Sequence, residues 1–305
     1  MRYLAPAILA MVLAACAAPS SEGLSASIEE RDDRLVIRVG GDVFAEYRYA
    51  PSQKYPYFYP VNGPSSGRSV TTESSEPYPH HHSLFFACDR VNGGNYWQEG
   101  LERGQIRQER VRVGERDGLR VSFVSENLWH RPGAPAPFRD RRTVTVFAPR
   151  ADLRVLDIEI AWTALQDVEI TRTNHALFSA RVVKALAVSA GGSLVNAEGA
   201  SGEKATFGVR TPWMDYNGKV ADHDPPLVEG IAILTHPDNP WSPTPWFTRD
   251  YGFFSPTPMH WLPGGRLEIH KGKTLVLRYR VIVHTGTAAE AGIAALYDSW
   301  IRAAR

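Results

Sequence analysis

Apolar and polar residues alternate over many short segments of the chain. A period of two places successive side chains on opposite faces of a strand, so one face is buried and the other solvated. The pair Asp117-Gly118, inside "VGERDGLRV", predicts a hairpin turn between two such segments. The segments with this alternation are 34–39, 118–124, 142–148, 153–162, 168–173 and 274–284.

The C-terminal segment "AAEAGIAALYDSWIRAAR" has a different period and predicts a helix. Its apolar residues fall at intervals of three and four, which gives one apolar stripe. We expect this helix to cover a face or an edge of a sheet rather than to carry chemistry. The stripe consists of Ile293, Leu296, Tyr297, Trp300 and Ile301.

So many strands in one span predict an all-β fold, a large two-sheet β-sandwich with a C-terminal helix. We find no internal repeat and no linker-like composition beyond about residue 25, so residues 26–305 are expected to form a single domain. Two long stretches, 51–83 and 211–262, are rich in proline, aromatic residues and histidine and show little regular pattern. Long loops in a compact domain are usually functional, so we expect the site in these stretches.

Composition narrows the possible partners. The 305 residues include 34 basic and 33 acidic side chains, for a formal net charge of +1. A nucleic-acid-binding domain normally has a strong basic excess. We therefore expect no nucleic-acid partner.

The first residues predict export. Arg2, the apolar stretch 4–13 and the small residues before Cys16 are typical of a secretory signal covering residues 1–15. "LAAC" also resembles the bacterial lipoprotein signal, which implies lipidation of Cys16, a tether over residues 16–25 and attachment to a membrane through the lipid. The expected location is extracytoplasmic, at the outer membrane, in the periplasm or at the surface. Plain secretion stays open, and the only other cysteine, Cys88, is expected to be a buried thiol.

Three consecutive histidines, His80, His81 and His82, follow a proline in "PYPHHHSLFFACDRVNGGNYW". Imidazoles need hydrogen-bond partners when buried, and their ordinary pKa near neutrality suits proton transfer. In an extended segment, His80 and His82 face one way and His81 the other. The run offers a general acid or base, or two ligands of a divalent metal with Asp89 or His236 as the third. Capping of loop backbone is the structural alternative.

A second cluster, "FGVRTPWMDYNGKV", combines Arg210, Trp213, Asp215 and Tyr216. Aromatic faces cover the C–H patches of sugars, while Arg and Asp bind hydroxyl or carboxylate groups. The mixture therefore suits sugar recognition. A structural Arg–Asp pair beside the turn at Asn217-Gly218 is the alternative.

A third cluster lies in "THPDNPWSPTPWFTRDYGFFSPTPMHW" and contains His236, Trp246, Arg249, Tyr251 and His260. Its prolines stiffen the loop, and a rigid loop loses little entropy when it binds a ligand. A binding platform is therefore expected, although such a loop can also simply close one end of a sandwich.

Further candidates are more isolated. Arg68 follows a turn-rich segment, and Trp97 follows an Asn-Gly-Gly turn and is expected to wall the site. His175 and Arg181 are six residues apart in a strand-like segment, which places them on one face. Motifs of serine hydrolases, P-loop proteins and dinucleotide-binding proteins are absent from the sequence, and so are the spacings HxxxH, HExxH and paired CxxC.

Several blocks of the chain resemble a bacterial family labelled "methane oxygenase PmoA", in the right order from about residue 55 to the C-terminus. The resemblance implies an exported β-sandwich protein associated with polysaccharide breakdown, with a galactose-mutarotase-like supersandwich fold. Methane oxidation itself is not expected, because after the signal no apolar run approaches the ~18 residues that a membrane span requires. The blocks are "YFYPVNGPSSGRSVT", "PHHHSLFFACDRVNGGNYW", "LVNAEG", "FGVRTPWMDYNG", "GIAILTHPDNPW", "TRDYGFFSPTPM" and "LRYRVIVHTG".

The resemblance also implies where a site lies. Many family members have an acidic residue and a histidine before "PHH" and an arginine after it, where this chain has Pro77-Tyr78 and His82. Roles assigned to those flanking positions therefore do not carry over. The family's recurring "PHH", the Arg after "FG", "DY", "HP" and "RDYG" fall on 79–81, Arg210, 215–216, His236 and 249–252.

We therefore expect an exported carbohydrate-active protein, an enzyme that processes a glycoside or oligosaccharide as a hydrolase, lyase or epimerase by histidine acid–base chemistry. A non-catalytic carbohydrate-binding lipoprotein and a metal-dependent enzyme at the triple histidine stay open. The catalytic candidates are His80, His81, His82, His236 and Asp215, and the metal-ligand candidates His80, His82 and His236. The substrate-binding candidates are Arg68, Trp97, Arg181, Arg210, Trp213, Tyr216, Trp246, Arg249 and Tyr251.

Overall fold

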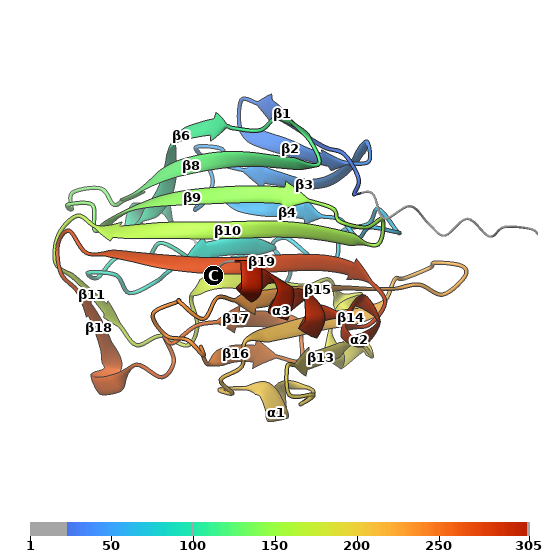
Figure 1. The fold of residues 1–305 in the computed structure, drawn as a ribbon. Helices are drawn as coiled ribbons and strands as arrows, with labels where there is room; N and C mark the ends of the chain where they lie inside the picture. Colours follow the sequence, from blue (N-terminus) through green and yellow to red (C-terminus); the bar gives the residue numbers. More distant parts are fainter. Residues whose placement is uncertain (1–22, 99, 304–305) are drawn as a thin grey trace, which may run out of the picture.

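Two large antiparallel sheets lie face to face in the computed structural model, which describes residues 23–98 and 100–303 (Figure 1). A separate two-stranded sheet and a C-terminal helix complete the fold. The predicted all-β sandwich with a C-terminal helix is confirmed. The predicted signal, Cys16 and most of the tether lie outside the described residues, so lipidation stays a prediction.

The first sheet has nine strands and forms the back of the molecule in Figure 1. In spatial order its strands are β16 (Trp246–Arg249), β17 (Phe253–Pro256), β12 (Leu177–Arg181), β5 (Leu84–Ala87), β4 (Tyr57–Val61), β3 (Asp42–Arg48), β2 (Arg34–Val39), β1 (Ala26–Arg31) and β7 (Asp117–Gly118).

The second sheet has eight longer strands, and short helices lie around it. Its strands are β13 (Ser193–Asn196), β14 (Trp213–Lys219), β15 (Val228–Thr235), β19 (Thr274–Thr285), β10 (Leu153–Ala164), β9 (Phe138–Phe147), β8 (Arg120–His130) and β6 (Gln105–Val113). The two-stranded sheet pairs β11 (Val168–Thr171) with β18 (Arg266–Ile269). The helices are α1 (Glu203–Thr206), α2 (Ala288–Ala291) and α3 (Ile293–Ala303), and the 3₁₀ turns are η1 (Leu101–Arg103), η2 (Lys184–Leu186), η3 (Val188–Ala190) and η4 (Pro263–Gly265).

Aromatic pairs between the sheets form the core. Phe178 of β12 stacks on Tyr279 of β19 with ring centroids 4.4 Å apart. Phe86 of β5 meets Trp162 of β10 edge-on at 5.6 Å. Such offset and edge-on contacts add to the stabilisation that burial of the rings supplies. The core therefore fixes which face of each strand points inward.

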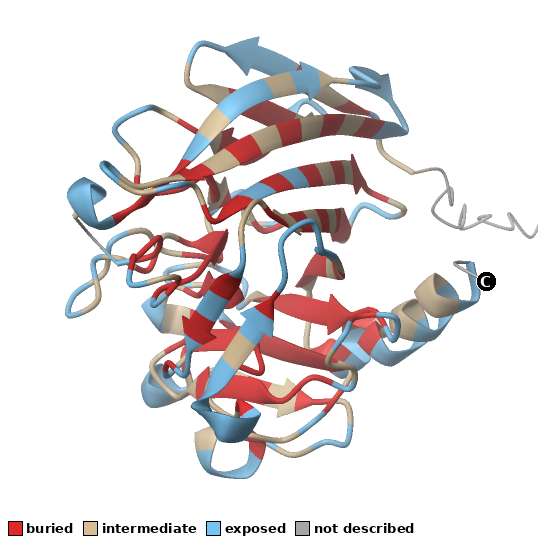
Figure 2. Ribbon diagram, turned by 90° about the vertical axis from the view of Figure 1, so that its left-hand side faces the viewer, coloured by how far each residue is buried: buried red, intermediate tan, exposed pale blue. Residues whose placement is uncertain are grey.

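The strands differ in how many faces are covered (Figure 2). β8 and β10 alternate between buried and partly exposed residues, as the sequence pattern predicts. In β12, β15 and β17 nearly every residue is buried, so both faces of these strands are covered. Loops and helices therefore pack over the outer faces of both sheets at this end of the sandwich.

Three predictions need correction or refinement. The stretch 211–262 is not irregular, because it contains β14 to β17. The C-terminal helix is interrupted at Gly292, whose φ of 73° ends α2 before α3 begins. Asp117-Gly118 lies in the connection between β6 and β8 and also pairs with β1. None of the described helices has the length and apolar character needed to cross a bilayer.

Candidate functional site

The outer face of the nine-stranded sheet carries the candidate site. In β12 and β17, Phe178 and Phe254 point into the core, where they contact residues of the opposite sheet. Strand alternation therefore places Arg181 and Phe253 on the outer face. The loops that carry the histidine run and Trp97 close over this face, as the following contacts show.

His81 occupies the centre of this arrangement and is 1% exposed. Its ring lies parallel to that of Trp97 at 5.7 Å and also contacts Phe253 at 4.5 Å. Tyr78 stacks on it at 5.0 Å, and His80 meets it edge-on at 4.6 Å. His80 is only half-buried, so it lies between the buried ring of His81 and solvent.

His175 joins the same group of rings from the segment before β12. It stacks on Phe247 at 4.3 Å and meets Trp97 edge-on at 4.4 Å. Its ring centroid lies 5.7 Å from that of His81. His175 contacts His81, and the charge of Arg181 lowers the pKa of the same histidine. Both residues therefore lie close to His81, which agrees with the prediction that they share a face.

Several buried polar atoms in this group have no hydrogen-bond partner among the described residues. They account for eight of the fifteen buried side-chain nitrogen and oxygen atoms without one: both ring nitrogens of His81 and of His175, Nε1 of Trp97, Nε and Nη1 of Arg181, and Nδ1 of His260. Buried polar groups in folded proteins are nearly always paired, so this concentration indicates a place where a ligand supplies the partners.

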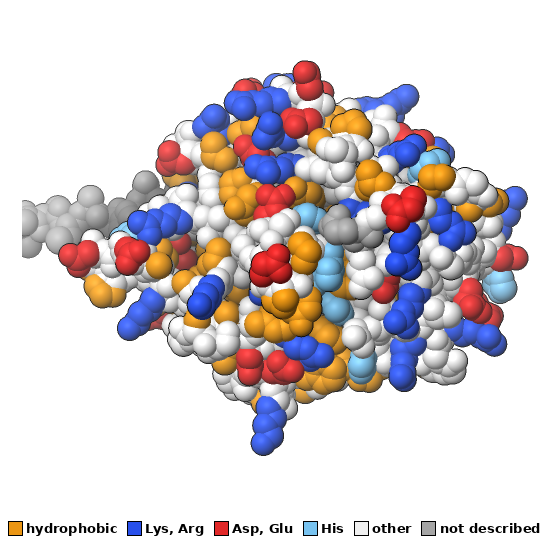
Figure 3. Space-filling view, turned by 180° about the vertical axis from the view of Figure 1, so that it is seen from behind, with side chains coloured by type: hydrophobic (Ala, Val, Ile, Leu, Met, Phe, Trp, Pro, Cys, Tyr) orange, Lys and Arg blue, Asp and Glu red, His pale blue; other side chains and the backbone are white. Residues whose placement is uncertain are grey.

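We call this group the aromatic–histidine cluster. Figure 3, seen from behind, shows histidine side chains gathered in a column near the middle of that face, with hydrophobic side chains around them. The cluster consists of Tyr78, His80, His81, Trp97, His175, Arg181, Phe207, Phe247, Arg249, Tyr251, Phe253 and His260.

Arg181 is the unusual charge in the cluster. It is 7% exposed, and its guanidinium carbon lies 4.3 Å above the ring of Tyr251. No described carboxylate lies within ion-pair distance of it. Burial lowers the pKa of Arg181, and the groups that act in the other direction are only the phenols of Tyr251, Tyr216 and Tyr78. Among residues 23–98 and 100–303, the buried cation therefore has no counter-ion.

The second arginine of the cluster is compensated. The guanidinium of Arg249 lies 4.1 Å above the ring of Phe247 and donates a hydrogen bond of 3.0 Å to Glu203. Glu203 begins α1 and also accepts a bond from the backbone N–H of Asp250. Arg249 therefore already has an anionic partner.

Burial sets the protonation states of two histidines and one tyrosine of the cluster. Burial lowers the pKa of His175 to about 3, assisted by the nearby His80, Arg249 and His260. The pKa of His81 is lowered well below its ordinary value, again mainly by burial. Burial raises the pKa of Tyr251 to about 12. At neutral pH the two histidines are thus neutral hydrogen-bonding groups, and Tyr251 keeps its proton.

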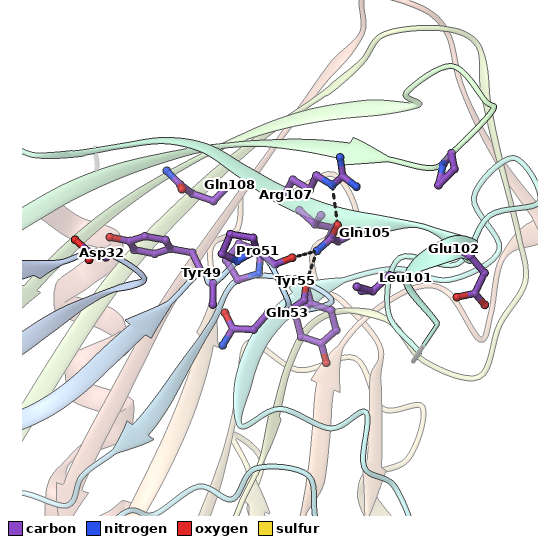
Figure 4. Close-up of a pocket in the computed structure, with 14 residues that line it drawn as sticks. Asp32, Tyr49, Pro51, Gln53, Tyr55, Leu101, Glu102, Gln105, Arg107 and Gln108 are labelled. Atoms are coloured by element: carbon purple, nitrogen blue, oxygen red, sulfur yellow. Dashed lines mark hydrogen bonds between the residues drawn. The ribbon is translucent and has the colours of Figure 1, made fainter.

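A cavity of about 610 Å³ lies beside the cluster (Figure 4). Tyr55 lines it and also reaches the histidine run, because its hydroxyl donates to the backbone oxygen of His80 at 2.5 Å. The side chains labelled in Figure 4 come from the β1–β2 turn, the β3–β4 connection, η1 and β6. They are Asp32, Tyr49, Pro51, Gln53, Tyr55, Leu101, Glu102, Gln105, Arg107 and Gln108.

The family comparison covers most of the chain. Residues 34–298 match a family of unknown function, DUF6807. The chain belongs to this family. None of the comparisons connects DUF6807 with the PmoA label. The family match therefore does not support the resemblance to the PmoA-labelled family. The comparison with curated proteins found no match.

Similar solved structures include several proteins with carbohydrate-related names. A putative aldose 1-epimerase from Escherichia coli K12 is 12% identical, with 87% of this chain and 99% of that chain covered and a TM-score of 0.34. A galactose mutarotase related enzyme from Lactobacillus acidophilus is 8% identical, with 85% and 97% covered and a TM-score of 0.30. An alpha-galactosidase from Lactobacillus brevis is 9% identical, with 86% and 39% covered and a TM-score of 0.37. Likenesses this distant carry no argument about the activity of the DUF6807 chain.

The structure brings together six of the predicted site residues and separates the others. His80, His81, Trp97, Arg181, Arg249 and Tyr251 lie in the cluster, together with His260 and His175. Trp97 does not wall an open site as predicted, because it is 1% exposed and lies behind the histidines. His82 stacks on Tyr57 at 4.9 Å. The prediction that His80 and His82 face the same way is wrong, because a turn closed by the bond from the His81 N–H to the Tyr78 oxygen interrupts the extended run and brings His80 against His81.

Asp215 is not part of the cluster. Its carboxylate lies 2.6 Å from Nε2 of His284 in β19, and both side chains are fully buried. Burial opposes protonation of His284, but the Asp215 carboxylate outweighs it and raises the pKa of that histidine. Trp213, on the same face of β14, packs under α2 and α3. Alternation along β14 thus turns both side chains to the opposite side of the molecule.

His236 also lies on that opposite side, because it follows β15 and contacts Trp300 of α3 at 5.2 Å. The predicted ligands His80, His82 and His236 are therefore not assembled. Within residues 23–98 and 100–303, no three His, Cys, Asp or Glu side chains are grouped so that they could hold a metal ion.

The remaining candidates serve the framework. Tyr216 is buried in the core and donates its hydroxyl proton to the backbone oxygen of Arg249. Trp246 is buried, and its Nε1 donates to the backbone oxygen of Thr211 at 2.8 Å. The exposed Arg210 donates to the backbone oxygen of Pro243 at 2.8 Å, and Arg68 donates to that of Ala221.

The sequence reading missed the aromatic residues Phe247, Phe253 and Tyr78. Phe247 and Phe253 lie in β16 and β17, which form a hairpin with Thr248 opposite Phe254. Recognition of this hairpin would have placed Trp246 inward and Phe247 outward by alternation. The prolines and glycine around it obscured that signal.

Proposed function

We propose that this DUF6807 chain is a carbohydrate-active enzyme that binds an acidic sugar at the aromatic–histidine cluster and removes the proton next to its carboxylate. The observation that carries the proposal is Arg181, a buried cation with two unpartnered nitrogen atoms and no described counter-ion. Burying an uncompensated charge costs several kcal/mol unless a partner arrives. The carboxylate of a sugar acid supplies that partner and forms charge-assisted hydrogen bonds with the guanidinium.

The rest of the cluster suits a sugar ring. The half-buried rings of Tyr78 and Tyr251, stacked 5.1 Å apart, offer apolar surface for C–H groups. The unpartnered nitrogens of His81 and His175 offer donors and acceptors for hydroxyl groups. A sugar acid thus satisfies both the cation and the neutral polar atoms.

Proton abstraction is the chemistry that these groups support. The described residues of the cluster contribute imidazole, phenol and guanidinium groups, and the carboxylate of Glu203 is already paired with Arg249. They do not form the pair of carboxylates that glycoside hydrolysis uses. Arg181 stabilises the negative charge that develops on the substrate carboxylate when the neighbouring C–H bond breaks.

Two groups of the cluster supply the base and the acid for this reaction. His80, at the solvent side, takes the proton from the carbon next to the carboxylate. In elimination the freed electron pair forms a carbon–carbon double bond, and the glycosidic oxygen leaves with a proton from Tyr251. In epimerisation the same carbanion takes a proton from Tyr251 on its other face, and the proton held by His80 returns to Tyr251 through solvent. Both reactions share the first step and the same residues.

A turnover assay tests the proposal. Purified protein is incubated with oligosaccharides containing uronic acid and with neutral ones, in deuterated water. Elimination gives an unsaturated, ultraviolet-absorbing product, and epimerisation gives deuterium next to the carboxylate. We expect turnover of acidic substrates only, with a loss of at least about 100-fold for His80→Ala and for Tyr251→Phe. Tyr297→Phe, on α3, is the matched control.

Two outcomes would contradict the proposal in different ways. Tight binding of the acidic sugar without turnover would leave a binding protein and remove the catalytic half. Turnover of neutral oligosaccharides with no binding of acidic ones would remove the role of Arg181.

We further propose that the protein is lipid-anchored outside the cytoplasm. The support is the sequence around Cys16, with the basic Arg2 and the apolar stretch before it. Replacement Cys16→Ser should release the protein from the membrane fraction in the native host. Retention of that variant in the membrane would contradict the anchor.

A further inference from the structure

The cavity of about 610 Å³ in Figure 4 has no role in the proton transfer described above. We propose that it is a second carbohydrate subsite, which binds a neutral sugar unit linked to the acidic unit in the cluster. The inference rests on the proposed function and makes the substrate a mixed oligosaccharide rather than a single sugar acid. A volume of this size falls in the usual range of small-molecule sites.

The cavity and the cluster share a wall. Tyr55 lines the cavity, stacks on Phe85 at 5.1 Å and meets His82 edge-on at 5.4 Å. Phe85 in turn lies 6.1 Å from Trp97 of the cluster. A continuous row of rings therefore runs from the cluster to the cavity along the outer face of the nine-stranded sheet.

The segment after Trp97 also joins the two places. Trp97 points into the cluster, whereas Leu101 and Glu102 of η1, only a few residues later, line the cavity. Asn95 holds the start of this segment, because its Oδ1 accepts bonds from the backbone N–H of Trp97 and of Gln98. Trp97 and η1 therefore place described residues of the same part of the chain at the cluster and at the cavity.

The lining of the cavity matches sugar chemistry. Pro51, Tyr49 and the 40% exposed Leu101 supply apolar surface, and Gln53 and Gln108 supply amides. Oε1 of Gln53 is a buried acceptor without a partner among the described residues. A sugar hydroxyl can donate to it.

The cavity and the cluster differ in the charged residues around them. Asp32 and Glu102 line the cavity, and the exposed Arg107 is its only lining cation among the described residues. Arg107 donates from Nε to Oε1 of Gln105 at 2.7 Å. Burial raises the pKa of Tyr49 to about 12, and nearby carboxylates, Glu30 among them, add to the shift. These surroundings disfavour a second acidic unit and favour a neutral one.

The second subsite is tested by the dependence of affinity on chain length. Calorimetry compares a uronic acid monosaccharide with oligosaccharides in which it is linked to neutral hexoses or to further uronic acids. Gln53→Ala and Gln108→Ala alter the cavity, and two variants are used because Gln53 also bonds the hydroxyl of Tyr57. Gln166→Ala, whose amide bonds the backbone of Pro135, is the matched control.

We expect the wild type to gain about tenfold or more in affinity from the neutral extension and little from the acidic one. Both cavity variants should lose this gain yet bind the monosaccharide as the wild type does, and Gln166→Ala should keep it. Binding of the monosaccharide with no gain from extension, or a gain that survives in both cavity variants, would overturn the second subsite alone. Failure to bind any acidic saccharide would overturn the proposed function as well.

Discussion

Two buried arginines come from different sheets, one pointing into the core and the other lying on an outer face. Arg142 of β9 reaches through the core and is 4% exposed, and Arg181 on the outer face is 7% exposed. Arg142 donates to Asp140 at 2.9 Å and to the backbone oxygens of Pro56 and Phe86. For Nε and Nη1 of Arg181, the part of the chain that the structure describes supplies no such partners.

The difference appears in the electrostatics. Burial lowers the pKa of Arg142, but Asp140 and Tyr47 together outweigh burial, so the net shift of the pKa is upward. For Arg181 burial dominates and the pKa is lowered. A buried charge that is satisfied within the protein serves the fold, whereas one that is left unsatisfied indicates an external partner. Burial alone does not distinguish a structural arginine from one that binds a ligand.

The largest expected effect comes from Arg142→Met. The variant leaves the buried Asp140 carboxylate with bonds from Asn127 and Trp129 but without its cation. Breaking one side of a buried ion pair costs about 3–5 kcal/mol. We expect a loss of this size in the free energy of unfolding, measured by urea denaturation at pH 7. A loss below about 1 kcal/mol would mean that Arg142 is not the structural member of the comparison.

An intermediate effect is expected from acidification. The pKa values of His81 and His175 are lowered in the folded state, whereas unfolded histidines titrate near about 6.5. The unfolded state therefore takes up more protons as the pH falls below that value. Each histidine should remove about 1.4 kcal/mol of stability per pH unit, down towards its lowered pKa.

Denaturation at pH 6.5 and pH 5 checks this slope, in a window above most carboxylate titrations. His175→Phe keeps the ring stacked on Phe247 and should remove about one histidine's share of the slope. His270→Gln is the control, because the His270 side chain is 88% exposed. An unchanged slope in His175→Phe would contradict the neutral, buried state of that ring.

The smallest effect on stability is expected from Arg181→Met. The variant removes a buried cation without leaving an unpaired anion, and methionine fills similar space against Tyr251. Replacing unfavourable buried charge by apolar groups is often neutral or stabilising. We expect a change within about 1 kcal/mol, or a gain, by the same urea measurement. A loss as large as that of Arg142→Met would make Arg181 a structural residue.

Much of the fold could be predicted from alternation. The segments 34–39, 153–162 and 274–284 correspond closely to β2, β10 and β19. Strands β14 to β17 were missed because buried residues on both faces remove the alternation and prolines flank them. The apolar stripe correctly predicted which face of the C-terminal helix packs against the sheet. The break at Gly292 was not predicted, and it arises from the left-handed conformation of that glycine.

The candidate site was predicted only in part, and for one physical reason. His80 and Tyr251 reach the cluster from connections at the outer face, and Arg249 reaches it from the last position of β16. His236 comes from the same sequence cluster as Arg249 and Tyr251, and Asp215 from the cluster before it. Both nevertheless lie on the side of the molecule that α3 covers, which only the sheet order determines. Residue type indicated the chemistry, and topology decided which residues meet.

The most direct test of the account is the affinity of Arg181→Met for a uronic acid, measured by calorimetry. Arg210→Met is measured beside it as the control, because among the described residues Arg210 donates a hydrogen bond only to loop backbone. Loss of one partner of a desolvated charge pair costs about 2–5 kcal/mol. The account predicts a loss of affinity on the order of 100-fold or more in Arg181→Met and wild-type affinity in Arg210→Met. Wild-type affinity in Arg181→Met would contradict the claim that this unpaired cation binds the acidic group of the substrate.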